Sequence, residues 1–165
     1  VVHLRMAAAL ELETPTGLPA GTGMVCVGEQ TIGFRWVKGR WKSTDFIPNR
    51  YLIEKRAAAQ ARDRGCRDMA QGVVRDPGNQ TATMLGCYMI RREGDDAEER
   101  REQVCLERWR AAGKRWVLDE VACDNFRFRP DGWFHRTSLH GELSATPPDD
   151  RKEPLSVSVG HCRLR

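Results

Sequence analysis

The six cysteines constrain the fold more than any other feature of this sequence. They are Cys26, Cys66, Cys87, Cys105, Cys123 and Cys162, and no two lie within four residues of each other. This spacing lacks the Cys-x-x-Cys pairs that are typical of zinc ribbons and thioredoxin-like redox sites. An even number of widely spaced cysteines favours three structural disulfides formed in an oxidising compartment. The alternative is six buried free thiols in a cytosolic protein, since free cysteine packs like a small apolar residue.

A specific set of disulfides follows if the strands form a closed meander. Cys26 lies near the start of the chain and Cys162 near its end. The first and last strands of a closed meander are neighbours, so Cys26 is expected to pair with Cys162. Cys105 and Cys123 flank an expected hairpin, which leaves Cys66 and Cys87 for each other.

Residues 34–44 have the pattern of a β-hairpin. Alternating positions flank a turn at Lys38 and Gly39, and this turn pairs Trp36 with Trp41. The rings of Phe34, Trp36 and Trp41 then share one face, which we expect to be the core face. The opposite face carries Arg35, Val37, Arg40 and Lys42.

Residues 126–137 form a second expected hairpin, which turns at Pro130, Asp131 and Gly132. Alternation gathers three rings on one of its faces, namely Phe126, Phe128 and Phe134. The other face carries Arg127, Arg129, Trp133 and His135.

The segment 95–123 fits two structures. In one, a helix begins at Asp96 and ends at Gly113. In the other, which we adopt, a short helix over 97–103 precedes a hairpin. That hairpin turns at 111–114 and puts Trp109 opposite Trp116.

The remaining patterns predict a mainly β fold. Further strands are expected at 24–27, 50–53, 83–91, 140–144 and 155–159, and the alanine-rich residues 57–64 have high helix propensity. Short strands at hairpin spacing predict an antiparallel meander, closed as a small barrel or packed as a sandwich, with one or two short peripheral helices. Residues 1–23 are expected to be an N-terminal arm or loose segment, and 24–165 a single β-rich domain.

The sequence contains no run of about 18 apolar residues, so no membrane span is expected. Residues 5–21 have the order of a secretory signal, but Glu11 and Glu13 interrupt what should be its apolar core. We therefore expect a periplasmic or secreted protein whose signal is not visible in this chain. If the six cysteines are free thiols instead, the expected location is the cytoplasm.

No motif for catalysis, for a metal or for a cofactor is present. His135 and His140 are five residues apart, which places them on opposite faces of a strand and on no shared helical face. The serines lie in no Gly-x-Ser-x-Gly elbow. We therefore predict no catalytic residue, no metal ligand and no cofactor. A small hydrolase would need a pocket built from distant residues, with His135, His140 and Asp124 as candidates.

Basic residues are concentrated in one part of the chain. The formal net charge is +4, but residues 33–67 hold ten basic and three acidic side chains, a local charge of +7. Four of the basic residues belong to the first hairpin and form a candidate anion-binding stripe: Arg35, Lys38, Arg40 and Lys42. The expected partner is an anionic polymer or surface, or a protein assembly partner.

These observations lead to one hypothesis and two alternatives. The hypothesis is a small, non-catalytic, disulfide-stabilised β-domain that acts as a binding or assembly module outside the cytosol. The first alternative is a subunit of a larger particle, such as a virion or a surface layer. The second alternative is the small hydrolase.

Overall fold

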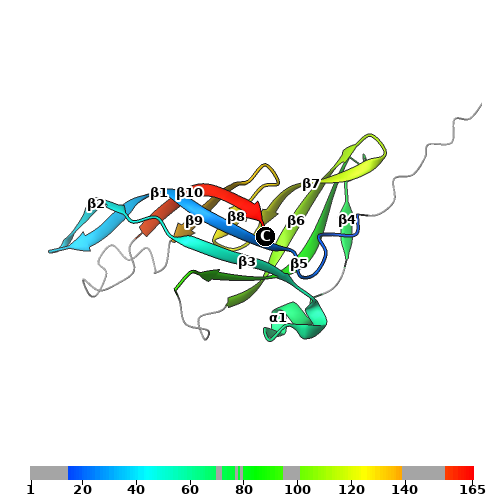
Figure 1. Cartoon of the computed structure of the whole chain (residues 1–165), viewed down its shortest axis with the longest axis horizontal. Helices are drawn as coiled ribbons and strands as arrows, with labels where there is room; N and C mark the ends of the chain where they lie inside the picture. The colour runs from blue at the N-terminus through cyan, green and yellow to red at the C-terminus, as the bar shows by residue number, and fades with distance from the viewer. Residues whose placement is uncertain (1–14, 70–71, 77, 79, 95–100, 139–154) are drawn as a thin grey trace, which may run out of the picture.

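The computed structural model describes residues 15–69, 72–76, 78, 80–94, 101–138 and 155–165. Within them, antiparallel strands dominate and form one ten-stranded sheet (Figure 1). The strands are β1 (Gly23–Val37), β2 (Arg40–Phe46), β3 (Arg50–Arg56), β4 (Val73–Arg75), β5 (Thr81–Arg92), β6 (Arg101–Ala112), β7 (Arg115–Ala122), β8 (Phe126–Phe128), β9 (Trp133–Ser138) and β10 (Leu155–Leu164). A 3-10 turn, η1 (Ala58–Gln60), and a one-turn helix, α1 (Arg64–Arg67), lie outside the sheet.

Eight of the strands close into a ring. Their order is β1-β3-β5-β6-β7-β8-β9-β10, and β10 pairs again with β1. Each described pairing is antiparallel, so the chain follows a meander around the ring. β2 extends from β1, and β4 pairs with β5 outside the ring. The mainly β, antiparallel fold predicted from the sequence is confirmed, in its closed form.

The tight turns come from residues that tolerate a positive φ. Lys38 and Gly39 have φ values of 50° and 76°, which gives a two-residue turn whose twist matches the paired strands. The predicted pairing of Trp36 with Trp41 is confirmed, and their rings meet edge to face with centroids 5.3 Å apart. Gly113, with a φ of 65°, makes the corresponding turn between β6 and β7.

Aromatic rings fill the middle of the ring of strands. Phe126 and Phe134 are stacked with centroids 5.0 Å apart, and Tyr51 meets both rings edge-on. The predicted inward face of the second hairpin is therefore confirmed, since Phe126, Phe128 and Phe134 are buried. The core as a whole consists of Met24, Cys26, Tyr51, Ile53, Tyr88, Cys105, Val121, Cys123, Phe126, Phe128 and Phe134.

The three disulfides join the pairs that the sequence analysis expects. Cys26–Cys162 ties the first strand to the last, where the two residues lie directly opposite each other. Cys105–Cys123 links β6 to the end of β7. Cys66–Cys87 holds α1 against the outside of β5, over a small second cluster with Ala61.

The helix predictions are wrong in part. Residues 57–64 form no continuous helix, because α1 begins only after Asp63, whose carboxylate caps the amide of Cys66 at 3.0 Å. Residues 101–103 of the expected helix belong to strand β6, where they pair with β5. Residues 97–100 and the expected strand at 140–144 lie outside the described residues.

The predicted hairpin after this segment is present, but its register differs. Trp116 pairs with Ala111, and Trp109 pairs with Leu118. The turn is shorter than predicted because Gly113 and Lys114 make it alone, and the β6–β7 register shifts again between Arg108 and Trp109.

One end of the ring is closed by the segment 15–22. The amide of Leu18 donates to Oε2 of Glu107 at 3.2 Å, and Gly21 and Thr22 hydrogen-bond the backbone of Lys55.

Glu107 is fully buried, pairs with Lys55 and accepts a 2.7 Å hydrogen bond from the hydroxyl of Tyr88. Burial, and then the charge of Glu107, raise the pKa of Tyr88 far above its usual value. The residues 1–14 of the expected N-terminal arm lie outside the described residues.

Candidate binding surface

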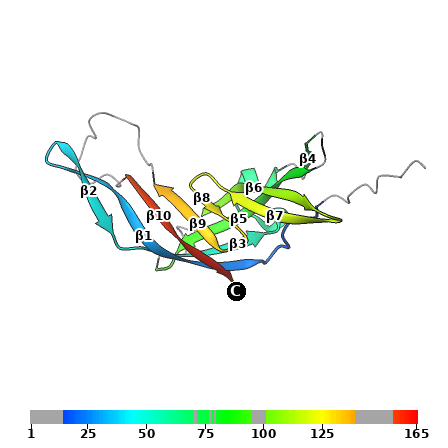
Figure 2. The same cartoon turned by 90° about the horizontal axis from the view of Figure 1, so that it is seen from above.

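A two-stranded arm projects from the end of the ring opposite the β6–β7 turn. It consists of residues 31–46, the far half of β1 with β2, and it lies at one end of the long axis of the molecule (Figures 1 and 2). In the described residues, the pairing of β10 with β1 extends to Phe34, where Leu155 is the partner. Both faces of the outer part of the arm therefore lie outside the barrel core.

A bulge in β1 decides which side chains each face of the arm carries. Gly28 pairs with Gly160 and Gln30 pairs with Val159, so Glu29 has no partner in β10. One extra residue reverses the alternation for all residues that follow. Cys26 before the bulge and Thr31 after it are both buried, although they are five residues apart.

This bulge overturns the predicted core face of the first hairpin. Phe34, Trp36 and Trp41 do share a face, but that face continues the outer surface of the barrel. Phe34 is 49% exposed and Trp41 is 38% exposed. If β1 kept all its residues but paired with β10 without a bulge, Phe34 and Trp36 would have continued the inward face of Cys26.

The predicted basic stripe lies on the other face of the arm, which continues the inward side of the barrel. Arg35 is directly opposite Lys42, and Arg40 is opposite Val37, with Lys38 in the turn. All four basic side chains are exposed. The guanidinium of Arg35 lies over the ring of Phe46, 5.3 Å from its centroid. We call Arg35, Lys38, Arg40 and Lys42 the basic face.

The basic face has no acidic side chain among its described neighbours in the sheet. Asp45 belongs to the same hairpin, but it pairs with Ile32 and therefore points to the opposite face. Two like charges directly opposite each other on neighbouring strands are unfavourable. The Arg35–Lys42 pair is thus an arrangement that an anionic ligand would stabilise.

Hydroxyl groups continue this face toward the barrel. Gly33 pairs with Thr44 on one side and with Ser156 on the other, and Ser156 pairs with Ser138. Beyond them, the guanidinium of Arg136 lies over the ring of Tyr51 at 5.4 Å. Arg136 was not among the residues predicted from the sequence, although alternation from Phe134 places it on the inward face.

The side opposite the basic face is apolar, and we call it the apolar face. Ile32 pairs with Val157, and Phe34 pairs with Leu155. The Trp36–Trp41 pair continues it to the tip. Asp45 and Ser43 are the polar residues that β2 adds to it.

Of the residues considered for hydrolysis, the two described ones, His135 and Asp124, are not brought together. His135 and Asp124 are both exposed and make no hydrogen bond or ion pair with each other, and His140 lies outside the described residues. His161 hydrogen-bonds Glu29 at 2.6 Å, and its ring packs against that of Trp133 at a tilt of 44°, with centroids 3.9 Å apart. Across the part of the chain that is described, no group of three or more His, Cys, Asp or Glu side chains is arranged to hold a metal ion.

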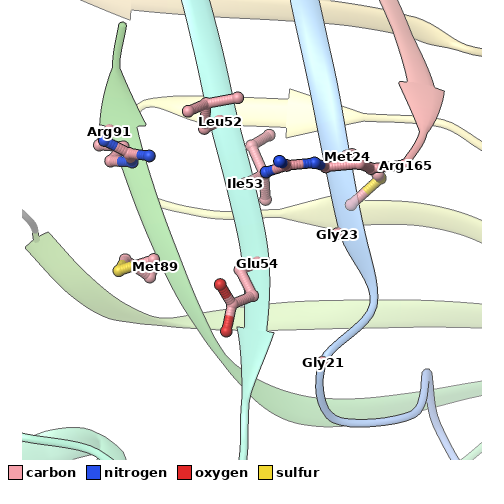
Figure 3. Close-up of a pocket in the computed structure, with 9 residues that line it drawn as sticks. All are labelled: Gly21, Gly23, Met24, Leu52, Ile53, Glu54, Met89, Arg91 and Arg165. Carbon is pink, nitrogen blue, oxygen red and sulfur yellow. The ribbon is translucent and has the colours of Figure 1, made fainter. Parts of the chain in front are cut away.

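A hollow of about 200 Å³ lies on the outside of the barrel, away from the arm. Gly21 and Gly23 leave it open because they have no side chains. Arg91 and Arg165 reach toward it from opposite sides, and Glu54 lies at its edge (Figure 3). Glu54 is already paired with Arg56 at 2.7 Å. This hollow offers far less charge than the arm.

No protein-family model matches this chain, and neither does any curated protein or solved structure at a significant level. Among the described residues, neither helical segment has the length and apolar composition to cross a bilayer. The features that bear on function are therefore the geometry of the arm and the three disulfides.

Proposed function

We propose that this protein is a non-catalytic binding module of an oxidising compartment, periplasmic or extracellular, that holds an acidic polysaccharide on the basic face of its arm. The observation that carries the proposal is the Arg35–Lys42 pair, in which two exposed cations face each other across two strands with no carboxylate on their face. A bound polymer would supply the missing negative charges.

The disulfides support the compartment. All six cysteines are paired, and the disulfide with the greatest sequence separation, Cys26–Cys162, joins the two strands that close the ring. Structural disulfides form and persist where the environment is oxidising. Three of them in a small β-domain fit a non-cytosolic module, and such modules meet acidic polysaccharides outside the cell.

The spacing of the charges supports a linear polymer as the ligand. Opposite residues on paired strands are about 5 Å apart, and residues two positions apart along a strand are separated by about 7 Å. The basic face thus presents charges in successive rows rather than around one point. A chain with regularly repeated sulfate or carboxylate groups can contact several rows at once.

The placement of the rings favours a polysaccharide over a single-stranded nucleic acid. Proteins that bind single strands combine cations with aromatic rings on which the bases stack. Here Trp36 and Trp41 lie on the opposite face of the arm, and Phe46 is next to the guanidinium of Arg35. Charge contacts are therefore expected to supply most of the affinity.

Heparin, a sulfated polysaccharide, serves as the probe in the test. The variant Arg35→Gln/Arg40→Gln/Lys42→Gln should elute from a heparin column at a clearly lower salt concentration than the wild type. The matched control is Lys114→Gln/Arg115→Gln/Arg163→Gln, which removes three exposed cations elsewhere and should elute close to the wild type.

Two results would contradict the proposal. Equal losses in the two triple variants would mean that only net charge matters. Tighter binding to single-stranded DNA than to heparin at the same salt concentration would identify a nucleic acid as the ligand. Thermal unfolding of both variants checks that the fold is intact, because exposed charges usually change stability by no more than about 0.5 kcal/mol.

A further inference from the structure

We propose that the apolar face of the arm is the docking surface for a second copy of this chain, related to the first by a two-fold axis. This inference goes beyond the proposed function, because it concerns the face of the arm that the polysaccharide does not use.

The apolar side chains of this face are exposed to solvent and lie next to one another across neighbouring strands. Ile32, Phe34 and Val157 are 51%, 49% and 42% exposed, and they are neighbours across the β1–β10 pairing. Leu155 extends the row beside Phe34. Exposed apolar side chains scattered singly are normal, but a contiguous apolar patch spread over neighbouring strands marks an interaction site.

The tip of the arm supplies rigid anchors for this contact. Trp36 and Trp41 hold each other edge to face, so little side-chain freedom remains to be lost when a partner covers them. Tryptophan is enriched among the residues that dominate interface energies. The backbone around them is fixed by the register of the hairpin.

The distribution of charge favours a second copy as the occupant. A two-fold contact brings the same surface of each subunit together, so like charges on that surface would repel. The apolar face avoids this, since Asp45 is its one ionisable residue among residues 31–46 and 155–157. Arg35, Arg40 and Lys42 point the other way, and Lys38 lies in the turn.

The same distribution argues against a lipid surface. A protein that binds an anionic bilayer presents its apolar and basic side chains to the same side, or lets the basic ones reach the headgroups. In this arm the alternation separates the two kinds of side chain by the full thickness of the sheet. A bilayer that covered Phe34 would leave Arg35 and Arg40 directed away from it.

Pairing through the apolar face would make the protein bivalent. Each copy would keep its basic face uncovered, and the two basic faces would point to opposite sides of the dimer. Two linked sites bind a long polymer with greater avidity than one site alone.

Sedimentation velocity over a range of protein concentrations tests this inference. The wild type is expected to shift from monomer to dimer, while Ile32→Thr/Phe34→Thr/Val157→Thr should raise the dissociation constant by about a hundredfold or more. Threonine keeps strand propensity at these positions. The matched control is Val74→Thr/Leu106→Thr/Leu164→Thr, three exposed apolar side chains outside the face, which should dimerise like the wild type.

Three results would overturn the inference. The first is a wild type that stays monomeric at all concentrations, and the second is an equal weakening of dimerisation in both variants. The third is a monomeric wild type that binds vesicles of phosphatidylcholine and phosphatidylglycerol in a flotation assay, while the Ile32/Phe34/Val157 variant does not. Retention of the Ile32/Phe34/Val157 variant on a heparin column tests the polysaccharide proposal separately from dimerisation, because a monomer with an intact basic face still binds heparin. A loss of dimerisation is interpreted only when the thermal unfolding curve is unchanged.

Discussion

Glu29 holds its carboxylate 2.6 Å from Nδ1 of His161 on the neighbouring strand β10. Between Met24 and Phe34, it is also the one residue of β1 that has no partner in the described register with β10. The hydrogen bond therefore fixes the bulge at the point where β1 leaves the barrel core and becomes the arm. The bulge accommodates one extra residue of β1, so both faces of the arm carry the side chains that simple alternation would give a strand one residue shorter.

Deletion of Glu29 should leave both faces of the arm as they are. Removing the extra residue restores simple alternation, with Gly28 inward, Gln30 outward and Thr31 inward, as in the present structure. The expected loss of unfolding free energy is about 1 to 2 kcal/mol, from the lost hydrogen bond and the changed twist. Urea denaturation measures this loss, and heparin retention should be unchanged.

Deletion of Ile32 is the matched comparison. It reverses the alternation of every residue from Gly33 to Val37, so that Arg35 would take the outward face and Phe34 the inward one. We expect a larger loss of stability and a loss of heparin retention. Equal behaviour of the two deletions would show that the register of β1 does not determine the faces.

The sequence allowed the fold class to be predicted because its strongest signals are local. The turn at Lys38 and Gly39 and the alternating rings of residues 126–134 determine hairpins through neighbouring residues alone. The pairing of Cys26 with Cys162 followed from one further assumption, that the meander closes.

The faces of the arm could not be predicted in the same way. The bulge at Glu29 is a relationship between β1 and β10, which are separated by more than a hundred residues, and no residue pattern within β1 marks it. The helix expected at 57–64 failed for a related reason. Alanine has high helix propensity, but residues 58–60 form only a 3-10 turn, and the α-helical turn comes later, where Asp63 caps it and Cys66 is joined to Cys87.

Removal of the Cys26–Cys162 disulfide should cost more stability than removal of either other disulfide. It spans 136 residues, whereas Cys66–Cys87 spans 21. In the chain-entropy description, these spans correspond to about 5 and about 3 kcal/mol. Equilibrium urea unfolding of the paired Cys→Ala variants gives the order, and a smaller loss for Cys26→Ala/Cys162→Ala would contradict it.

Gly86→Ala should destabilise the buried end of the barrel. A Cβ atom there would lie 2.7 Å from Oε1 of Glu107 and 2.8 Å from a ring carbon of Tyr88. Both neighbours are buried and hydrogen-bonded to each other, so neither can move without breaking a contact. We expect a loss of about 1 to 3 kcal/mol in urea unfolding. Gly72→Ala is the control, since a Cβ at Gly72 would meet nothing within 4 Å.

The buried hydroxyl of Tyr88 should make the protein sensitive to alkaline pH. Its pKa is raised in the folded state by burial and by Glu107, so the folded protein keeps this proton after the unfolded chain has lost it. Stability from this group is therefore constant below about pH 10, the usual pKa of tyrosine, and falls above it by about 1.4 kcal/mol per pH unit.

The Tyr88→Phe variant tests this dependence because it has no hydroxyl to titrate at position 88. At neutral pH it lacks the hydrogen bond to Glu107 and is less stable than the wild type. In urea unfolding between pH 8 and about 11.5, the stability difference between wild type and Tyr88→Phe should be constant at first and then shrink as the pH rises above about 10. A difference that stays constant over the whole range would mean that the folded protein ionises Tyr88 as readily as the unfolded chain does.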